Sequence, residues 1–246
     1  MTRVRIPPGA FIGMYSMKNV EFSFIIPVLN EEDYIGDCLD SIRKQLRKDY
    51  EVIVVDGGSS DKTAAISKKS GAVVIYEKMK GPGAARNTGA MHAKGRVLVF
   101  IDADVRIREN FLDDVDKKVH RAGGFICRLY SYDGFPSSYT LAHMILKLLF
   151  SLRIAMTAGS CFVYMKDVFN RAGGFNPALL TNEDHDLAIR ASRISRFMYF
   201  DDIHVMTSSR RVGRKGFIGS VKMYLKSTFA YFLNGTGIRG YWDYDS

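Results

Sequence analysis

The stretch RVLVFIDAD, residues 96–104, decides the fold, because a continuous apolar run ends there at two aspartates. An apolar run without polar alternation is typical of a strand buried on both faces of a sheet. Three similar runs precede it, at residues 22–28 (FSFIIPV), 51–56 (EVIVVD) and 72–76 (AVVIY). Turn residues or helical spacing of apolar residues follow each run, so the sequence predicts strands that alternate with helices.

Alternating strands and helices indicate an α/β fold with a mostly parallel central sheet covered by helices on both faces. Right-handed crossovers place all the strand-to-helix loops at one edge, and ligands bind such sheets at the carboxyl ends of the strands. We expect helices at residues 34–46, capped by Asn30, from Asp61 onward and at 85–93. The polar residues at the strand ends are Asn30 and Glu31, Asp56 and Gly58, and Asp102 and Asp104.

The pattern changes after Asp104, where shorter and less regular elements are expected. No linker is long enough to separate domains, so residues 21–246 are predicted to form one domain with a nucleotide half at 21–104 and an acceptor half at 105–212. Residues 1–20 are expected to be a disordered extension. The later elements are predicted as helix 109–120, edge strand 123–132, apolar helix 138–152, strand 159–165, helices 166–171 and 182–192, strand 197–205, and an amphipathic C-terminal helix within 213–234.

The composition restricts the class of protein. The chain has 246 residues, 47% of them hydrophobic, which suffices for one large core. Its three cysteines form no C-x-x-C pair, so neither a zinc knuckle nor a disulfide framework is indicated, and a cytoplasmic setting fits best. The net charge of +9 favours anionic partners without choosing among them. No stretch reads as a signal peptide or a membrane span.

The pair Asp102 and Asp104 places two carboxylates where Mg²⁺ or Mn²⁺ could bind, since these ions take few protein carboxylates and complete their shell with water and phosphate. The alternative is a turn whose aspartates cap the next helix. A second candidate is the Gly-rich segment at residues 81–87 (GPGAARN), where backbone N–H groups and Arg86 could meet phosphate oxygens. Its alternative is a solvated loop with Arg86 on a helix surface.

The third candidate is residues 183–190 (EDHDLAIR). Asp186 and Arg190 are spaced to pair on a helix, and Thr181 with Asp184 could form a capping box. The functional alternative is that Asp184 projects into the cleft as a general base, where a positioned carboxylate accepts a proton from a sugar hydroxyl. The spacing leaves both interpretations open.

Four segments taken together resemble the inverting GT-A glycosyltransferases of family 2. They appear in the order typical of that family and span residues 22–190. The segments are FSFIIPVLNEEDYIGDCLDSI, EVIVVDGGSSDKT, GPGAARNTGAMHAKGRVLVFIDADV and GSCFVYMKDVFNRAGGFNPALLTNEDHDLAIR. The resemblance implies a single Rossmann-like GT-A domain and a nucleotide-diphosphate sugar as donor.

The resemblance also implies roles for matching positions. Asp104 is the main ligand of Mn²⁺ or Mg²⁺, and Asp102 faces ribose and metal. Asp184 is the general base, with Glu183 beside it near the acceptor or the donor sugar. The nucleotide pocket is implied to involve Pro27, Leu29, Glu31, Asp56 facing the base, Gly58, and Arg86 near the diphosphate or base side.

Some family features are replaced here. Relatives carry a metal-binding histidine beyond the acidic pair, and the resemblance places Thr207 at that position, with His204 nearby. Residues 207–211 (TSSRR) could form a lid over the diphosphate or a solvated basic loop. The glutamine-to-tryptophan motif of processive relatives is absent, so transfer of a single sugar is expected.

The implied acceptor is a glycan or lipid-linked precursor, and no nucleic-acid motif is present. The last helix places Phe217, Val221, Tyr224, Leu225, Phe229 and Phe232 on one face, with basic residues near its start. This face could pack on the domain or contact an anionic membrane from the cytoplasmic side. The alternative functions are a nucleotidyltransferase and a catalytically inactive nucleotide-sugar-binding module of the same fold.

Overall fold

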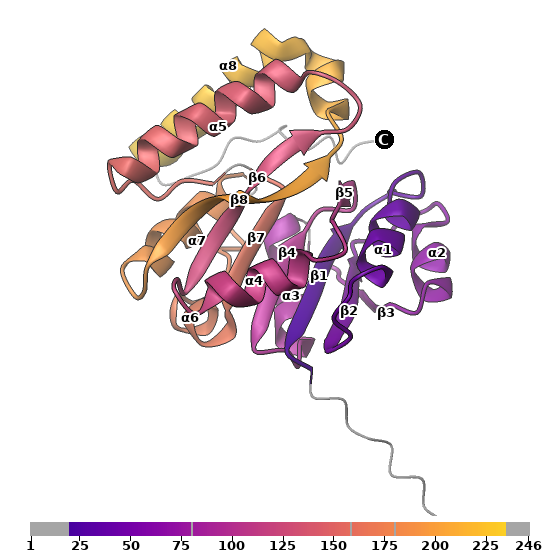
Figure 1. Cartoon of the computed structure of the whole chain (residues 1–246). Helices are drawn as coiled ribbons and strands as arrows, with labels where there is room; N and C mark the ends of the chain where they lie inside the picture. The colour runs from indigo at the N-terminus through magenta and orange to yellow at the C-terminus, as the bar shows by residue number, and fades with distance from the viewer. Residues whose placement is uncertain (1–19, 80, 158, 180, 235–246) are drawn as a thin grey trace, which may run out of the picture.

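The structure is a computed structural model that describes residues 20–79, 81–157, 159–179 and 181–234. Apart from Val20, the predicted N-terminal extension lies outside the described residues. Within the described residues, one eight-stranded sheet has helices on both sides (Figure 1). The predicted α/β fold with a central sheet is therefore confirmed.

The four predicted parallel strands lie next to one another in the order β3-β2-β1-β4. Each is within one residue of the predicted run at both ends: β1 (Phe22–Val28), β2 (Tyr50–Asp56), β3 (Val73–Tyr76) and β4 (Val97–Ile101). The second half of the sheet continues as β7-β6-β8-β5, with β7 antiparallel to both β4 and β6. Its strands are β5 (Val105–Arg106), β6 (Gly124–Ser131), β7 (Cys161–Met165) and β8 (Phe197–Thr207).

Helices cover the two faces of the sheet through two separate apolar clusters. One cluster joins α1 (Ile35–Arg43) and α4 (Phe111–Val119) to the side chains of Phe22, Phe24 and Ile26 in β1. The other joins α3 (Pro82–His92), α6 (Lys166–Arg171) and α7 (Glu183–Ser192) to the opposite face. The remaining helices are α2 (Thr63–Lys69), α5 (Pro136–Ser151) and α8 (Arg210–Asn234).

Glycine allows α3 to lie close to the sheet. A Cβ at Gly89 would clash with Ile25 in β1 and lie 3.1 Å from Val55 in β2. Because only glycine fits this approach, α3 lies directly against β1 and β2, two of the three strands whose carboxyl ends carry the polar clusters. The N-terminal half of α3, which contains Arg86, is thereby fixed beside those ends.

Several local predictions are wrong. Asn30 does not cap α1, whose N-cap is Tyr34. Residues 82–84 belong to α3 rather than to a loop, because proline is well suited to the first helical position. The β6 strand is not at an edge, since it pairs with both β7 and β8. The two-residue strand β5 was not predicted, and α8 begins at Arg210 with a kink at Gly216.

Across the described residues, no helix is long and apolar enough to cross a membrane. The three cysteines are buried free thiols.

Candidate functional site

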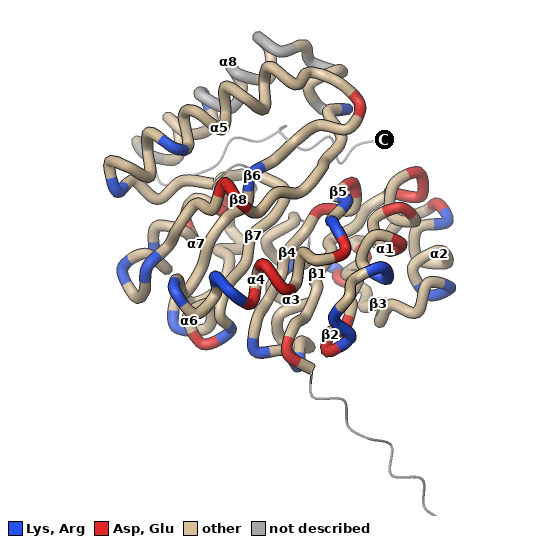
Figure 2. Tube along the Cα trace, in the orientation of Figure 1, with Lys and Arg blue, Asp and Glu red and all other residues tan. Residues whose placement is uncertain are grey.

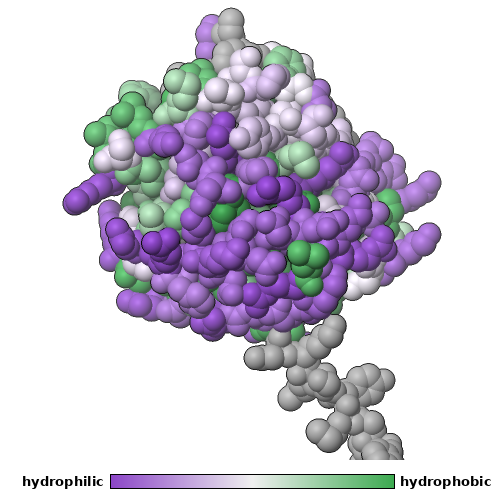
Figure 3. Space-filling view, viewed as in Figure 1, coloured by the Kyte–Doolittle hydropathy of each residue, from purple (hydrophilic) through white to green (hydrophobic). Residues whose placement is uncertain are grey.

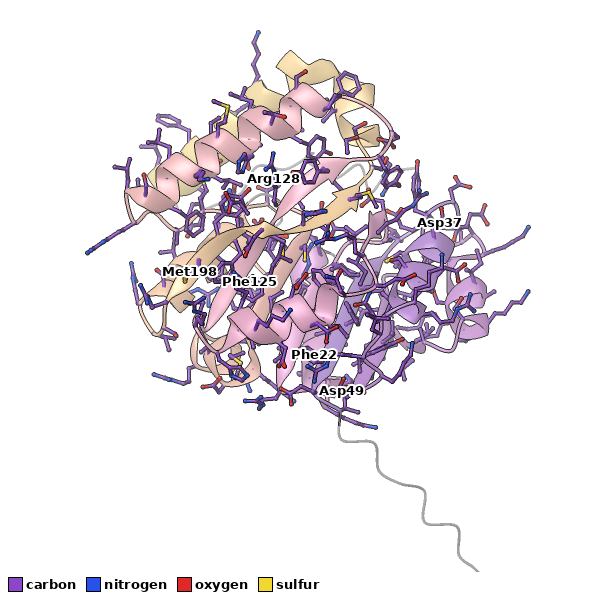
Figure 4. All side chains as sticks on the ribbon, viewed as in Figure 1. Phe22, Asp37, Asp49, Phe125, Arg128 and Met198 are labelled. Atoms are coloured by element: carbon purple, nitrogen blue, oxygen red, sulfur yellow. The ribbon has the colours of Figure 1, made fainter. Side chains whose placement is uncertain are left out.

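Most of the predicted site residues lie at the carboxyl ends of β1, β2 and β4, while Arg86 lies on α3 and Glu183 and Asp184 begin α7. Phe22 and Asp49 mark the opposite end of the sheet, where β1 and β2 start, and Asp37 lies toward the carboxyl ends (Figure 4). Val28 and Asp56 are register partners, so β1 and β2 end side by side. Pro27 and Leu29 are half-buried at this end. The sheet therefore brings the polar residues that follow its parallel strands to one edge, as predicted.

Asp56 organises the loop that follows β2. Its Oδ1 accepts hydrogen bonds from the backbone N–H of Gly58 at 3.0 Å and of Ser59 at 2.7 Å. Gly58 has a φ of 100°, which favours glycine. The Asp56 side chain is fully buried, and within the described structure its Oδ2 has no hydrogen-bond partner. One acceptor thus remains for a ligand that carries an N–H group.

The loop after β1 is pinned to the loop after β2. Asn30, which has a φ of 53°, accepts a hydrogen bond from the Ser60 N–H through Oδ1 at 2.9 Å. The Glu31 N–H donates to Thr63 Oγ1 at 2.8 Å. Asn30 therefore holds the neighbouring loop instead of capping α1, and this contact fixes the backbone of Glu31 near the strand ends.

Arg86 lies buried between two carboxylates that are 81 positions apart in the sequence. Its Nη2 donates to Asp102 at 2.9 Å and its Nη1 donates to Glu183 at 2.7 Å. The guanidinium also lies over the rings of Phe162 and Phe175. Arg86 is 2% exposed, so the alternative of a surface arginine is wrong. Burial acts to lower the pKa of Arg86, but the charges of Asp102 and Glu183 outweigh it and raise that pKa.

Glu183 begins α7 and lies almost completely inside the protein. Burial, followed by the negative charge of Asp184, raises the pKa of the Glu183 carboxyl to about 7, although Arg86 acts to lower it. A carboxyl that titrates near neutrality changes charge within the ordinary working range of a protein. The Arg86 cluster therefore gains a negative charge as the pH rises toward 8.

The raised pKa makes stability depend on pH. Because the pKa of Glu183 lies above its unfolded value, the folded protein binds the extra proton between about pH 4.5 and 7 and loses stability as the pH rises through that window. Glu183→Gln, which imitates the neutral carboxyl, should become more stable relative to the wild type across this range, by at most about 1.4 kcal/mol per pH unit. The melting temperatures of both proteins, measured from pH 4 to 8, test this prediction. A constant difference between the two melting temperatures over that range would contradict it.

Asp184 is held by two hydrogen bonds next to the Arg86 cluster. Its Oδ2 accepts from Thr157 Oγ1 at 2.7 Å, and its Oδ1 accepts from the His185 N–H at 3.0 Å. Thr157 also contacts His185 Nδ1. The capping-box alternative is wrong, because the N-cap of α7 is Asn182 and makes no side-chain cap bond. The predicted pair Asp186 and Arg190 is confirmed.

A second arginine, which is half-buried, neutralises the metal-binding candidate. Arg210 donates from Nε to Asp104 at 3.2 Å and from Nη2 to Glu31 at 2.7 Å, and its guanidinium lies over the Tyr34 ring. Thr207 Oγ1 donates to the other Asp104 oxygen at 3.2 Å. Residue Thr207, and not His204, therefore lies beside Asp104. The ring of His204 packs against Tyr130 instead.

The segment before Arg210 is fixed rather than solvated. Asp133 accepts hydrogen bonds from the Ser209 N–H at 2.7 Å and from Ser209 Oγ at 2.6 Å, and it also binds Ser208. Thr207, Ser208 and Ser209 are all buried. The solvated-loop interpretation of these residues is wrong, while the side chain of Arg211 lies outside the described residues. Neither Asp133 nor Thr157 was predicted, since nothing in their local sequence indicates these contacts.

The structure thus brings four of the six predicted carboxylates together in two clusters, each centred on an arginine: Asp102–Arg86–Glu183 and Glu31–Arg210–Asp104. Asp102 and Asp104 are two residues apart, so the clusters adjoin. In the part of the chain that the structure describes, no group of three or more His, Cys, Asp or Glu is placed to hold a metal ion. Any cation at Asp104 would therefore rely on few protein ligands.

Comparison with solved structures identifies the fold. The chain matches TarS of S. aureus, residues 1–349, with a TM-score of 0.65 at 25% identity over 77% of this chain and 61% of that one. TarS has also been crystallised with UDP-GlcNAc. The mannosyltransferase PcManGT of Pyrobaculum calidifontis, in complex with GDP-Man and Mn²⁺, matches with a TM-score of 0.65 at 21% identity over 84% of this chain and 64% of that one. The fold is GT-A.

Sequence comparison identifies the family. The poly(ribitol-phosphate) beta-glucosyltransferase of Bacillus spizizenii is 42% identical over 94 residues, which are 35% of this chain and 15% of that enzyme. The matched regions span between 15% and 40% of the lengths of five such curated relatives. The family model described as Glycosyl transferase family 2 matches residues 23–173, which is more than half of the chain. The chain therefore belongs to glycosyltransferase family 2.

Proposed function

We propose that this protein is an inverting glycosyltransferase that moves a single sugar from a nucleotide-diphosphate sugar to a hydroxyl or phosphate acceptor. The observation that carries the proposal is the Arg86 bridge. It links Asp102, at the end of β4, to Glu183 at the start of α7, next to Asp184. The bridge thus holds the start of α7 against the end of β4, so that the candidate base Asp184 follows directly on a residue bonded to the donor-side carboxylate.

The nucleotide is proposed to bind where β1 and β2 end. The buried Asp56 Oδ2 supports this assignment, because it is an acceptor without a partner in the described structure and a base can offer an N–H group to it. Pro27, Leu29 and Gly58 would line this part of the site, and Asp102 would face the ribose. The donor complexes known for TarS and PcManGT are consistent with a nucleotide-sugar ligand.

The residues around Asp104 fit a divalent cation. The carboxylates of Asp104 and Glu31 already share a cation, the Arg210 guanidinium, and Glu31 Oε2 is buried without a hydrogen-bond partner among the described residues. Asp104, with Asp102 beside it, would hold Mn²⁺ or Mg²⁺. When bound, that ion supplies positive charge that offsets the charge developing on the diphosphate leaving group.

Arg210 and the metal should compete for Asp104. Removing the guanidinium in Arg210→Ala leaves the carboxylates of Asp104 and Glu31 without their cation, which raises the gain from binding Mn²⁺. Mn²⁺ should therefore raise the melting temperature of Arg210→Ala by more than that of the wild type. Equal shifts in both proteins would contradict the competition. Arg43→Ala, which removes an exposed ion pair with Asp40, is the matched control.

Asp184 is proposed as the general base of the reaction. Its carboxylate would take the proton of the acceptor hydroxyl while the acceptor oxygen attacks the anomeric carbon from the face opposite the nucleotide. The bonds from Thr157 and the His185 N–H keep the carboxylate oriented. Glu183 and Arg86 would hold the start of α7 against Asp102. The transition state is oxocarbenium-like, and one displacement inverts the anomeric centre without a covalent intermediate.

The acceptor is proposed to be a glycan or lipid-linked precursor of a cell-surface glycan, modified at the cytoplasmic side of a membrane. The second half of the sheet, with α5 and α7, would form its binding side. Residues of the first half of the sheet would contact the donor, so the donor and the acceptor would meet between Asp104 and Asp184.

Product analysis separates this proposal from its alternatives. Incubation with UDP- or GDP-sugars and an acceptor extract should release nucleoside diphosphate and form a product of inverted configuration. Release of pyrophosphate from a nucleoside triphosphate and a sugar phosphate would indicate a nucleotidyltransferase instead. Binding of the donor without release of nucleoside diphosphate or pyrophosphate would indicate an inactive binding module.

A further inference from the structure

The helix α5 is strongly apolar and yet barely buried. Among its sixteen residues, Leu146 alone is buried. Leu141, Met144, Ile145 and Leu148 are all exposed, and Met144 and Leu148 reach 61% and 60%. Their spacing places them on one side of the helix, while His143 and Lys147 bind Tyr199 and Asp201 in β8. Figure 3 shows hydrophobic residues gathered over this helix, whereas the surface below it is hydrophilic.

The helix α8 presents a second exposed stripe. Ser227 binds Asn182 and Thr181, and Tyr231 binds Asp186, so this side of α8 faces the start of α7. The exposed side carries Lys222, Lys226, Phe229 and Leu233, which follow helical spacing along one face. Phe229 is 66% exposed. Of the apolar residues predicted to line this helix, Phe229 alone has a described side chain, and it does not pack on the domain.

The charged residues of these two helices are all basic. The α5 helix contains one lysine and α8 contains six basic residues, and neither contains an aspartate or glutamate. Of these basic residues, Lys147 is paired with Asp201 and Arg210 with Glu31 and Asp104, whereas Lys222 and Lys226 are exposed. They lie together at one end of the molecule, joined near their starts by the bond from Tyr139 to Ser208 (Figure 1), and Figure 2 shows no acidic residue on α5.

We propose that the exposed sides of α5 and α8 form a docking surface for an anionic lipid bilayer. Apolar side chains that insert at the headgroup boundary, surrounded by basic residues and free of acidic ones, are what such a surface requires. A second copy of this chain fits less well, because two such surfaces would bring like charges together. The Ser227 and Tyr231 contacts link this surface to the helix that carries Asp184, so docking would present the site to the membrane.

Vesicle flotation of the full chain tests the proposal without any donor or acceptor, so its outcome is separate from that of sugar transfer. The protein should float with vesicles of phosphatidylcholine mixed with phosphatidylglycerol, and much less with phosphatidylcholine alone. Lys222→Glu with Lys226→Glu should weaken binding about tenfold or more, since each basic residue near the surface contributes to it. Met144→Ser with Leu148→Ser should weaken it comparably, because apolar insertion is lost.

Matched controls change the same residue types elsewhere. Met91→Ser, at an exposed position of α3, and Lys69→Glu with Lys117→Glu, on α2 and α4, should float like the wild type. Equal loss in the controls and the surface variants would overturn the proposal. Failure of the wild type to float with any vesicle, or equal binding to neutral and anionic vesicles, would also overturn it. A third contrary result is a concentration-dependent dimer that Met144→Ser with Leu148→Ser dissociates, while neither the wild type nor this variant binds vesicles.

Discussion

Asp184→Asn should lower kcat for sugar transfer by a factor of about 10² to 10⁴, the usual contribution of a positioned general base. The substitution keeps the shape of the side chain, and its amide oxygen can still accept the bond from Thr157 Oγ1. The structure should therefore persist while the proton acceptor is lost. Donor affinity should change little, because Asp184 is proposed to act on the acceptor side.

Two further variants locate the effect at Asp184. Asp186→Asn lies on the same helix but pairs with Arg190 and Tyr231, so it should alter stability and leave kcat nearly unchanged. Thr157→Val removes the hydroxyl that orients Asp184 and should give an intermediate loss of kcat. If Asp186→Asn and Asp184→Asn were equally impaired, Asp184 would be a structural residue of α7 rather than the base.

Arg86→Met should destabilise the protein by about 3–5 kcal/mol, because removing one partner of a buried ion pair leaves the other charge uncompensated. Arg86 is 2% exposed and serves two carboxylates, Asp102 and Glu183. For a domain of this size, about 1 kcal/mol corresponds to roughly 2–4 °C in melting temperature. Arg86→Met should therefore melt roughly 6–20 °C below the wild type.

An exposed ion pair supplies the control for Arg86. Arg43 binds Asp40 at 2.9 Å on the surface of α1, and both side chains are more than half exposed. Arg43→Met should change the free energy of unfolding by at most about 1 kcal/mol, because surface pairs contribute little. A similar effect of both substitutions would mean that the Arg86 bridge is not a buried charge cluster in solution. At lower pH the loss of stability caused by Arg86→Met should be smaller, because Glu183 is then neutral and leaves no uncompensated charge.

The parallel half of the sheet could be predicted because its strands are continuous apolar runs that end at turn residues. β1 matches its predicted bounds at both ends for this reason. The later strands are less predictable. The Gly-rich start of β6 is typical of an edge strand, yet β6 is an interior strand because β8, which is distant in sequence, pairs with its free side. Local patterns also misplaced Asn30, whose side chain binds a neighbouring loop instead of its own helix.

The candidate site was predictable residue by residue but not as a set of contacts. Asp102, Asp104 and Asp184 stood out through their motifs. The partners that neutralise them did not, because Arg210 meets Asp104 from 106 positions away and Arg86 meets Glu183 from 97. Such long-range pairs depend on how β8 and α7 pack against the first half, which no local spacing encodes.

The central claim is that a nucleotide sugar and a divalent ion bind together at Asp104. The most direct measurement is the melting temperature with UDP-, GDP-, CMP- and dTDP-sugars, each with and without Mn²⁺, for the wild type and Asp104→Asn. A ligand that binds the native state alone raises the melting temperature by mass action. We predict a shift for one nucleotide class that needs Mn²⁺ and disappears in Asp104→Asn. No shift with any donor, or an equal shift in Asp104→Asn, would contradict the claim.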